Sequence, residues 1–342
     1  MSTTLDTSGD IFSAKRRLSR GRAKARSRKA RALMNRINRS SDELDAEILE
    51  ELREERADLI RAMIADREWE THFQPIVDLK SGDAIGTEAL SRFSDRSVRG
   101  PNEWFAEAAE VGLGIDLEVA ALDSALEQLP QLPSGLYLSL NASVETIMSD
   151  DFESRLDDVP AERIVLELTE HTEVTDYANF AQGLESLRSQ GVRLAVDDTG
   201  AGFSSLQHVL NLRPDIIKLD VGLTRGIDRD PARRALGRAL LTFGLDAYDA
   251  SIVAEGIETE GELEVLRALG CPCGQGFYLG RPGRLTQVQN TPPPQHLHVV
   301  ADRGSEADLP LLMRELLDDL EEAESERLNG RGVATAGRTR RA

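Results

Sequence analysis

Short apolar segments that each end near a polar side chain recur along the middle of this 342-residue chain. Helix-length segments separate them, and such alternation is typical of βα units that build a parallel sheet. The recurring segments are Gly86–Leu90, Tyr137–Asn141, Ile164–Glu167, Leu194–Asp198, Asp215–Asp220 and Ser251–Glu255. Polar residues gathered at strand ends form the active face of a (β/α)8 barrel, so we expect this α/β TIM-like fold.

Two adjacent carboxylates, Asp197 and Asp198, follow the apolar run Leu194–Val196. Neighbouring anions repel each other unless a proton or a cation lies between them. A divalent metal at the end of a buried strand is one interpretation. The other is an aspartate pair that caps the next helix and faces water. The recurrence of polar strand ends favours the metal.

Seven short motifs occur in a specific order along the chain. They are Thr87–Arg92, Asn141–Ser143, Glu167–Glu170, Asp197–Asp198, Lys218–Asp220, Glu255–Glu258 and Gln275–Phe277. In order and spacing they resemble the EAL-domain cyclic di-GMP phosphodiesterases, over approximately Glu68 to Pro282. The resemblance implies a barrel with an antiparallel first strand and a bacterial enzyme that opens cyclic di-GMP to linear pGpG. The short link Lys80–Asp83 between two strand-like segments also favours a hairpin.

The resemblance implies a site for two Mg²⁺ or Mn²⁺ ions. The positions it assigns to metals or their waters are Glu88, Asn141, Glu167, Asp197, Asp198, Asp220 and Glu255, with Asp198 between the two ions. All are oxygen donors, which hard divalent ions prefer. Two such ions activate water and offset charge on phosphoryl oxygens.

The same resemblance gives other roles to basic and amide side chains. Lys218 is expected to orient the attacking water and, with Glu255, to be catalytic, although a lysine among carboxylates ordinarily forms a structural ion pair. Arg92 is expected to hold a substrate phosphate with its planar guanidinium. Gln275 is expected to contact substrate or the waters around the metals.

The loop after Asp198 departs from the family pattern. Many relatives have Phe at Thr199, Thr at Ala201 and Tyr at Phe203. Glu170 and Glu258 match the residues that stabilise this loop. This departure affects the expected level of enzymatic activity. The alternative to an enzyme is a receptor that binds cyclic di-GMP without hydrolysing it and signals through its terminal helices.

The net charge of −19 includes a strongly basic segment, Lys15–Arg39, which holds twelve Lys or Arg and no acid. The rest of the chain therefore carries −31, since −19 less these twelve charges is −31. The acidic body discourages nonspecific binding of nucleic acid by the barrel. The arm either meets an anionic lipid, a nucleic acid or an acidic protein, or is a solvated segment with no dedicated ligand.

We expect four parts: a basic disordered arm (1–40), an amphipathic helix (41–67), the barrel (68–290), and a proline linker with an acidic amphipathic helix and tail (291–342). In the second part Leu44, Ile48, Leu52, Leu59 and Met63 lie mostly on one helical face. Such a face packs on the barrel or pairs with a partner helix.

The sequence contains no apolar stretch long enough to cross a bilayer. Cys271 and Cys273 are too close for an ordinary disulfide, and we expect them to pack in the core. These features favour a reducing cytoplasm, and the resemblance implies that the cell is a bacterium. The resemblance further implies a homodimer that forms near the helices flanking the Lys218 strand.

Overall fold

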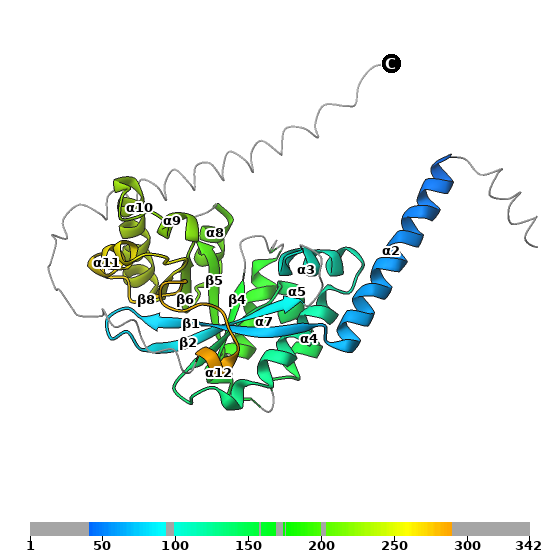
Figure 1. The fold of residues 1–342 in the computed structure, drawn as a ribbon, viewed down its shortest axis with the longest axis horizontal. Coiled ribbons are helices and arrows are strands. Elements are labelled where there is room, and N and C mark those ends of the chain that lie inside the picture. Colours follow the sequence, from blue (N-terminus) through cyan, green and yellow to red (C-terminus); the bar gives the residue numbers. More distant parts are fainter. Residues whose placement is uncertain are drawn as a thin grey trace, which may run out of the picture.

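The computed structural model describes residues 41–93, 99–156, 159–168, 174, 176–199 and 203–288, and its eight strands form one closed barrel (Figure 1). The strands are β1 (Trp69–Asp78), β2 (Ala84–Phe93), β3 (Tyr137–Asn141), β4 (Ile164–Leu168), β5 (Arg193–Thr199), β6 (Ile216–Leu219), β7 (Ser251–Ala254) and β8 (Cys273–Gly274). The basic arm and the predicted C-terminal helix lie outside the described residues.

Helices connect most of the strands along the chain. The α-helices are α2 (Ser41–Asp66), α3 (Pro101–Glu110), α4 (Gly114–Leu126), α5 (Val144–Ile147), α6 (Asp150–Glu153), α7 (Tyr177–Ser189), α8 (Phe203–Leu212), α9 (Val221–Thr224), α10 (Pro231–Thr242), α11 (Glu260–Ala268) and α12 (Leu285–Val288). The 3₁₀ turns are η1 (Leu129–Gln131) and η2 (Ala161–Arg163), and η3 (Phe243–Ala247) is a π-helical turn.

The predicted TIM-like barrel with an antiparallel first strand is confirmed. β1 pairs antiparallel with both β2 and β8, whereas all pairs from β2–β3 to β7–β8 are parallel. The last strand, β8, is only two residues long, and Gln275 and Gly276 follow it outside the ladder. Gln275 still lies at the carboxyl end of β8.

The interior of the barrel is filled by a cluster of side chains, one from each strand except β2. The cluster consists of Ile76, Tyr137, Val165, Ala195, Ile216, Val253 and Cys273, all buried. At the corresponding position of β2 the chain has Gly86, and a Cβ atom there would lie 2.5 Å from the Tyr137 ring. The glycine therefore makes room for the ring that closes this layer.

Side chains of the opposite parity pack outward against the helices. On β4, for example, Ile164, Leu166 and Leu168 are fully buried in a cluster with residues of the surrounding helices, such as Phe180 and Leu184 of α7. Because successive side chains of a strand point to opposite faces, Val165 and Glu167 point inward instead. This alternation delivers every second residue of each strand to the barrel interior.

α2 lies on the outside of the barrel and projects beyond it (Figure 1). Its second half packs through Ile60 and Met63 against Trp104 of α3 and Leu117 of α4. The sequence left two alternatives for this helix, packing on the barrel or pairing with a partner helix. The second half of α2 packs on the barrel. The face that makes the contact includes Ala57 and Ile60, which are not among the stripe identified in the sequence.

The tight contact at Gly86 gives a stability prediction. Gly86→Ala should lower the free energy of unfolding by about 1–3 kcal/mol, because overpacking a full core forces neighbouring groups apart. Urea unfolding of wild type and variant measures the difference. Gly100→Ala is the matched control, since an added Cβ there has nothing within 4 Å. Equal stability of the two alanine variants would contradict this packing.

Candidate active site

A polar layer lies directly above the apolar layer, at the carboxyl ends of the parallel strands. It consists of Gln74, Glu88, Ser139, Glu167, Asp197, Lys218, Glu255 and Gln275, one side chain from each strand or from the residue directly after it. On β3 to β8 each member stands two positions after a residue of the inner layer, as Glu167 follows Val165, and on β2 Glu88 stands two positions after Gly86. On the antiparallel β1 the order is reversed, and Gln74 precedes Ile76 and pairs with Glu88.

Lys218 is the centre of this layer. Its side chain is only 2% exposed, and its Nζ lies 2.7 Å from Glu167 Oε2 and 2.7 Å from Glu255 Oε1. Asp197 Oδ1 is 3.3 Å away and Glu88 Oε2 is 3.6 Å away. We refer to Lys218 and these four carboxylates as the Lys218 cluster. One ammonium cannot neutralise four carboxylates, so the cluster favours binding of further cations or protons.

The electrostatics of the Lys218 cluster follow from this imbalance. Burial lowers the pKa of Lys218, but the surrounding carboxylates, led by Asp197, raise it well above its ordinary value. Burial and the charge of Glu88 raise the pKa of Glu167 to about 8. Burial likewise raises the pKa of Glu255 well above the ordinary value. The lysine is therefore a cation, and the acids hold protons unusually well when no other cation is present.

A bulge in β5 brings both aspartates to the same space. Val196 pairs with Ile217 and Thr199 with Leu219, so that Asp197 and Asp198 together stand opposite Lys218. Asp198 has φ 54°, a left-handed conformation that aspartate tolerates better than most residues. Its N–H donates to Asp197 Oδ1 at 2.9 Å. Without the extra residue the two side chains would point to opposite faces of the sheet.

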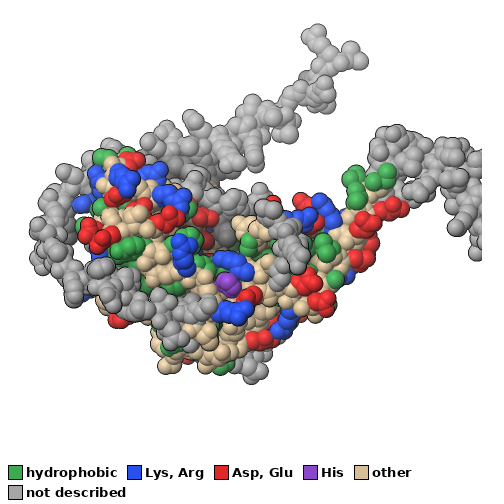
Figure 2. All heavy atoms as spheres, viewed as in Figure 1, with side chains coloured by type: hydrophobic (Ala, Val, Ile, Leu, Met, Phe, Trp, Pro, Cys, Tyr) green, Lys and Arg blue, Asp and Glu red, His purple; other side chains and the backbone are tan. Residues whose placement is uncertain are grey.

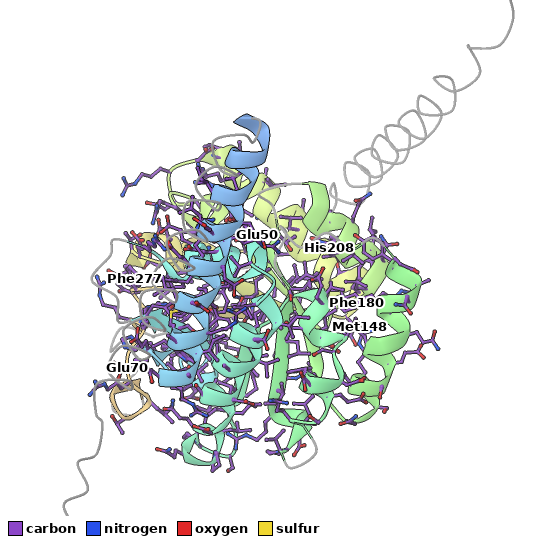
Figure 3. The ribbon with its side chains drawn as sticks, turned by 90° about the vertical axis from the view of Figure 1, so that its right-hand side faces the viewer. Glu50, Glu70, Met148, Phe180, His208 and Phe277 are labelled. Atoms are coloured by element: carbon purple, nitrogen blue, oxygen red, sulfur yellow. The ribbon has the colours of Figure 1, made fainter. Side chains whose placement is uncertain are left out.

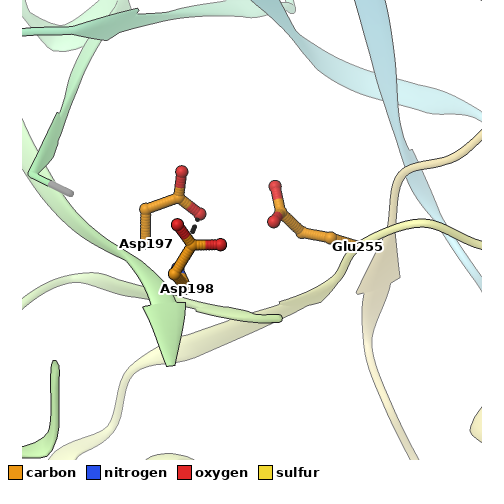
Figure 4. Close-up of side chains that lie close together, drawn as sticks. All are labelled: Asp197, Asp198 and Glu255. Atoms are coloured by element: carbon orange, nitrogen blue, oxygen red, sulfur yellow. Dashed lines mark hydrogen bonds between the residues drawn. The ribbon is translucent and has the colours of Figure 1, made fainter. Parts of the chain in front are cut away.

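The bulge completes a group of carboxylates that suits a metal ion. Oxygen atoms of Asp197, Asp198 and Glu255 lie within 4.8 Å of one another, and Figure 4 shows the three side chains facing a common space. Hard divalent ions prefer such oxygen donors. The carboxylates therefore fit Mg²⁺ or Mn²⁺, and their excess charge over Lys218 gives a physical reason to bind one.

Hydrogen bonds from neighbouring strands hold the remaining predicted ligands. Asn141 Nδ2 donates to Glu88 Oε1 at 2.9 Å, and Gln275 Nε2 donates to Glu88 Oε2 at 2.6 Å. Ser139 Oγ donates to Glu167 Oε1 at 2.5 Å. The structure thus brings Asn141 and Gln275 into contact with Glu88, and it orients both oxygens of Glu88 and Glu167.

Four predicted residues lie at the margin of the site or outside it. Asp220 caps the short helix α9 and accepts from Gly222 N at 2.7 Å. Glu258 accepts from Arg225 Nη2 at 2.6 Å. Arg92 is half-buried on β2, on the same face as Glu88, and donates to Ser91 O. Glu170 lies outside the described residues, so its predicted role, like that of the other three, remains a prediction.

Three polar residues were not predicted from the sequence: Ser139 and Gln74 belong to the site, and Glu262 holds the backbone beside Glu258. Ser139 orients Glu167, as described above. Gln74 Oε1 accepts from Gln275 Nε2 at 3.1 Å, while Gln74 Nε2 donates to Gly280 O at 3.1 Å. The buried Glu262 accepts from the backbone N–H groups of Gly226, Glu258 and Thr259. The available signal was strand parity, because Gln74 within His72–Leu79 and Ser139 within Tyr137–Asn141 both have the parity of an inward residue.

Thr199 is the last residue of β5, directly after the two aspartates. Its side chain is 1% exposed, and its hydroxyl has no hydrogen-bond partner among the described residues. The three residues that follow it, 200–202, lie outside the described part of the chain. A buried threonine thus stands at the base of the loop that follows the two aspartates, at a position where the resemblance to the family leads us to expect a phenylalanine.

Comparison with known proteins identifies the kind of barrel. The family model described as "EAL domain" matches residues 56–282, more than half of the chain. A sequence relative is the bifunctional diguanylate cyclase/cyclic di-GMP phosphodiesterase MucR of Pseudomonas aeruginosa, 31% identical over 235 residues. That match covers 65% of this chain and 34% of MucR, so the chain spans about a third of the length of this relative.

Two solved structures extend the comparison. The MucR phosphodiesterase in complex with c-di-GMP has a TM-score of 0.60 and 30% identity, and the match covers 67% of this chain and 97% of that chain. Klebsiella pneumoniae BlrP1, in a manganese and cyclic di-GMP complex, has a TM-score of 0.56 and 29% identity, over 63% of this chain and 56% of that chain.

The raised pKa values give a prediction about pH. A carboxyl whose pKa is raised by folding takes up protons on folding, so it stabilises the fold at low pH and this stabilisation is lost as the pH rises through the folded pKa. For Glu167 the stability is lost between pH 4.5, its ordinary pKa, and about pH 8, its pKa in the folded protein. The pKa of Glu255 is raised in the same direction. Metal-free protein should therefore melt at a lower temperature at pH 8 than at pH 6.

Thermal melting in EDTA across this range measures the effect. Glu167→Gln should flatten the dependence of the melting temperature on pH, and excess Mg²⁺ or Mn²⁺ should raise the melting temperature most at pH 8. An unchanged slope in Glu167→Gln would show that another group causes it.

The hydrogen bonds of Gln74 predict a role in orienting the Gln275 amide. Gln74→Leu removes the acceptor for Gln275 and should weaken Mn²⁺ binding about tenfold, because partners that orient ligating carboxylates tune metal affinity. Titration calorimetry with Mn²⁺ measures this. Gln190→Leu, at an exposed position on the outside of the barrel, is the matched control. Equal affinities of the two variants would contradict the role.

Proposed function

The chain belongs to the EAL domain family, and from this premise we propose that it hydrolyses cyclic di-GMP to linear pGpG with the help of divalent metal ions. The observation that carries the proposal is the Lys218 cluster, with Asp198 beside it, at the carboxyl ends of the barrel strands. This is the end at which (β/α)8 enzymes hold their catalytic groups. Hydrolysis would lower cyclic di-GMP signalling in the cell.

The metal ligands in this proposal are Glu88, Asn141, Glu167, Asp197 and Asp198, and we propose two Mg²⁺ or Mn²⁺ ions. Divalent ions, when bound, acidify water and offset the negative charge of phosphoryl oxygens. The side chains of this protein orient the carboxylates that would hold the ions. Gln275 and Asn141 hold the two oxygens of Glu88, and Ser139 and Lys218 hold those of Glu167.

Lys218 donates hydrogen bonds in this scheme. In the metal-free site the surrounding carboxylates raise its pKa well above the ordinary value, which favours the ammonium form. Held between Glu167 and Glu255, its ammonium is fixed in position, and it can donate to the oxygen of a water or a phosphate that enters the cluster. Glu255 keeps 17% side-chain exposure, which makes it the more accessible of these two partners.

Arg92 is proposed to hold a phosphate of the substrate. It stands four residues after Glu88 on the same face of β2, about 13 Å further along the strand. Its guanidinium has no carboxylate hydrogen bond among the described residues, and Ser91 O is its acceptor. Burial lowers the pKa of Arg92 while the charge of Glu88 raises it, and the guanidinium remains charged near neutral pH. A substrate phosphate would supply the missing anionic partner.

Other parts of the proposal concern assembly and location. We propose a homodimer through the helices that flank β6, where Leu210 of α8 and Leu236 of α10 are exposed. We also propose an anionic partner for the arm 15–39 and a bacterial cytoplasmic location. The free thiols of Cys271 and Cys273 are compatible with that compartment. No helix in the described ranges has the length and apolar character of a membrane span.

A second candidate function is a receptor that binds cyclic di-GMP and turns it over poorly. The observation that favours it is Thr199, which replaces the phenylalanine of many relatives at the base of the loop after Asp198. The predicted ligand types argue against it, because none of them is missing in this chain.

The direct test is an assay of purified protein with cyclic di-GMP and Mg²⁺ or Mn²⁺, with separation of the products. We expect pGpG from the wild type and at least a hundredfold lower rate from Glu88→Gln, because a ligand of the metals and a partner of Gln275 is changed. Glu145→Gln, an exposed carboxylate in α5, should retain the wild-type rate.

Binding measurements separate the two candidate functions. Tight binding of cyclic di-GMP by the wild type without turnover at any metal concentration would support the receptor. Absence of both binding and turnover would overturn both candidates.

A further inference from the structure

α2 carries two different apolar faces, and only one of them meets the barrel. Ala57, Ile60 and Met63 are at most 3% exposed and pack toward α3 and α4. On another face Ile48, Leu52 and Leu59 are 45%, 50% and 48% exposed. At 100° per residue these three fall within about 40° of one another, and Ala57 and Ile60 lie at least about 80° from them, while Met63, about 20° from Leu52, borders both faces at the carboxyl end of the helix. The exposed residues therefore form a separate surface.

The exposed surface has the spacing of a coiled-coil seam. Ile48, Leu52, Glu55, Leu59 and Ala62 follow one another at intervals of four, three, four and three residues, and all are exposed. We refer to them as the exposed stripe. In heptad terms Leu52 and Leu59 are a positions, and Ile48, Glu55 and Ala62 are d positions. Figure 2 shows hydrophobic side chains among acidic ones on this helix, and Figure 3 shows the helix along the outside of the barrel.

The residues that flank the exposed stripe are complementary to a second copy of the same helix. Glu51 is a g position and Arg56 the e position five residues later. In a parallel two-stranded coiled coil these two positions meet across the interface. Glu51 of each chain would thus face Arg56 of the other, and the pair occurs twice by symmetry. Arg56 is half-exposed, although it also contacts Glu107 and Glu110 of its own chain.

From these observations we propose that the exposed stripe of α2 pairs in parallel with the same stripe of a second copy of this chain. This interface is distinct from the one proposed on the helices beside β6. The face that docks on the barrel lies at b, e and f positions, namely Ile60, Met63 and Ala57, so each barrel sits to one side of its own helix. Pairing on the a and d positions leaves that contact intact.

The arm 15–39 is a less suitable occupant. Its charge complements the acidic side chains of α2, but between Leu18 and Leu33 its only aliphatic side chains are alanines. It therefore lacks the continuous apolar face needed to cover three turns of helix. Glu55 is the one charged residue in the exposed stripe, and two such carboxylates facing each other weaken the pair while restricting its register.

Cysteine cross-linking in the full chain tests the pairing. Leu52→Cys places a thiol at an a position, where a parallel, in-register pair brings the two copies within the range of a disulfide. We expect a covalent dimer under mild oxidation, seen on a non-reducing gel. Arg53→Cys, one residue along on the exposed surface, is the control and should cross-link far less. The native Cys271 and Cys273 are buried and should not contribute.

Charge exchange tests the flanking pair. Glu51→Arg and Arg56→Glu alone should each weaken the dimer in sedimentation equilibrium, and the double variant should restore it. Arg56→Glu also removes the contacts from Arg56 to Glu107 and Glu110 of its own chain, and Glu51→Arg cannot restore those contacts. Recovery of the dimer in the double variant is therefore specific to the intermolecular pair. Glu55→Leu should tighten the dimer roughly tenfold or more, because it replaces facing carboxylates with an apolar d layer.

Several outcomes would overturn the proposal. One is equal cross-linking of Leu52→Cys and Arg53→Cys. A second is a full chain whose sedimentation is unaffected by Leu52→Glu and Glu55→Leu. A third is a wild-type chain that is monomeric and whose melting temperature is clearly lowered by Leu52→Glu. That result would mean that the chain's own arm covers the exposed stripe.

Discussion

The buried ammonium of Lys218 is the interaction on which the arrangement of the barrel mouth depends. Transferring an ammonium from water into a protein costs several kcal/mol unless anions and hydrogen bonds replace its hydration. Here the replacement comes from carboxylates of β2, β4 and β5 and from the residue after β7. Removal of one partner from such a buried pair commonly costs about 3–5 kcal/mol. The stability of the buried Lys218 ammonium therefore depends on the order of the strands, on their register and on the charges of the four carboxylates.

The sequence predicted polar side chains at the strand ends, and the resemblance to a known family supplied their individual roles. The polar residues after Val165, Ala195, Ile216 and Val253 stand two positions beyond an apolar inward residue, a pattern visible in the sequence. The bulge of β5 was not predictable in this way, because it depends on how β5 and β6 pair. The bond between Gln74 and Gln275 joins residues 201 positions apart. Amide partners at that separation leave no local signal in one sequence.

α2 shows a different limit of sequence reasoning. Helical periodicity identified a stripe that includes Ile48, Leu52, Leu59 and Met63, but of these four only Met63 docks on the barrel, together with Ala57 and Ile60 of a neighbouring face. Which face docks is decided by the shape that Trp104 and Leu117 present on α3 and α4, and those helices lie beyond the window of any local pattern. Periodicity finds apolar faces, whereas the tertiary surface selects between them.

The antiparallel pairing of β1 has a consequence for the order of folding. Val77 pairs with Gly274, a separation of 197 residues since 274 less 77 is 197, while the β1–β2 hairpin is local. Loop-closure entropy makes such a distant contact slow to form, and a high mean sequence separation of contacts is associated with slow folding. A nascent chain can form its first hairpin early, yet it cannot close the ring until almost the entire barrel has left the ribosome. Until then both edges of the unfinished sheet remain open to other polypeptides, so chaperone protection of the growing chain matters most over this interval.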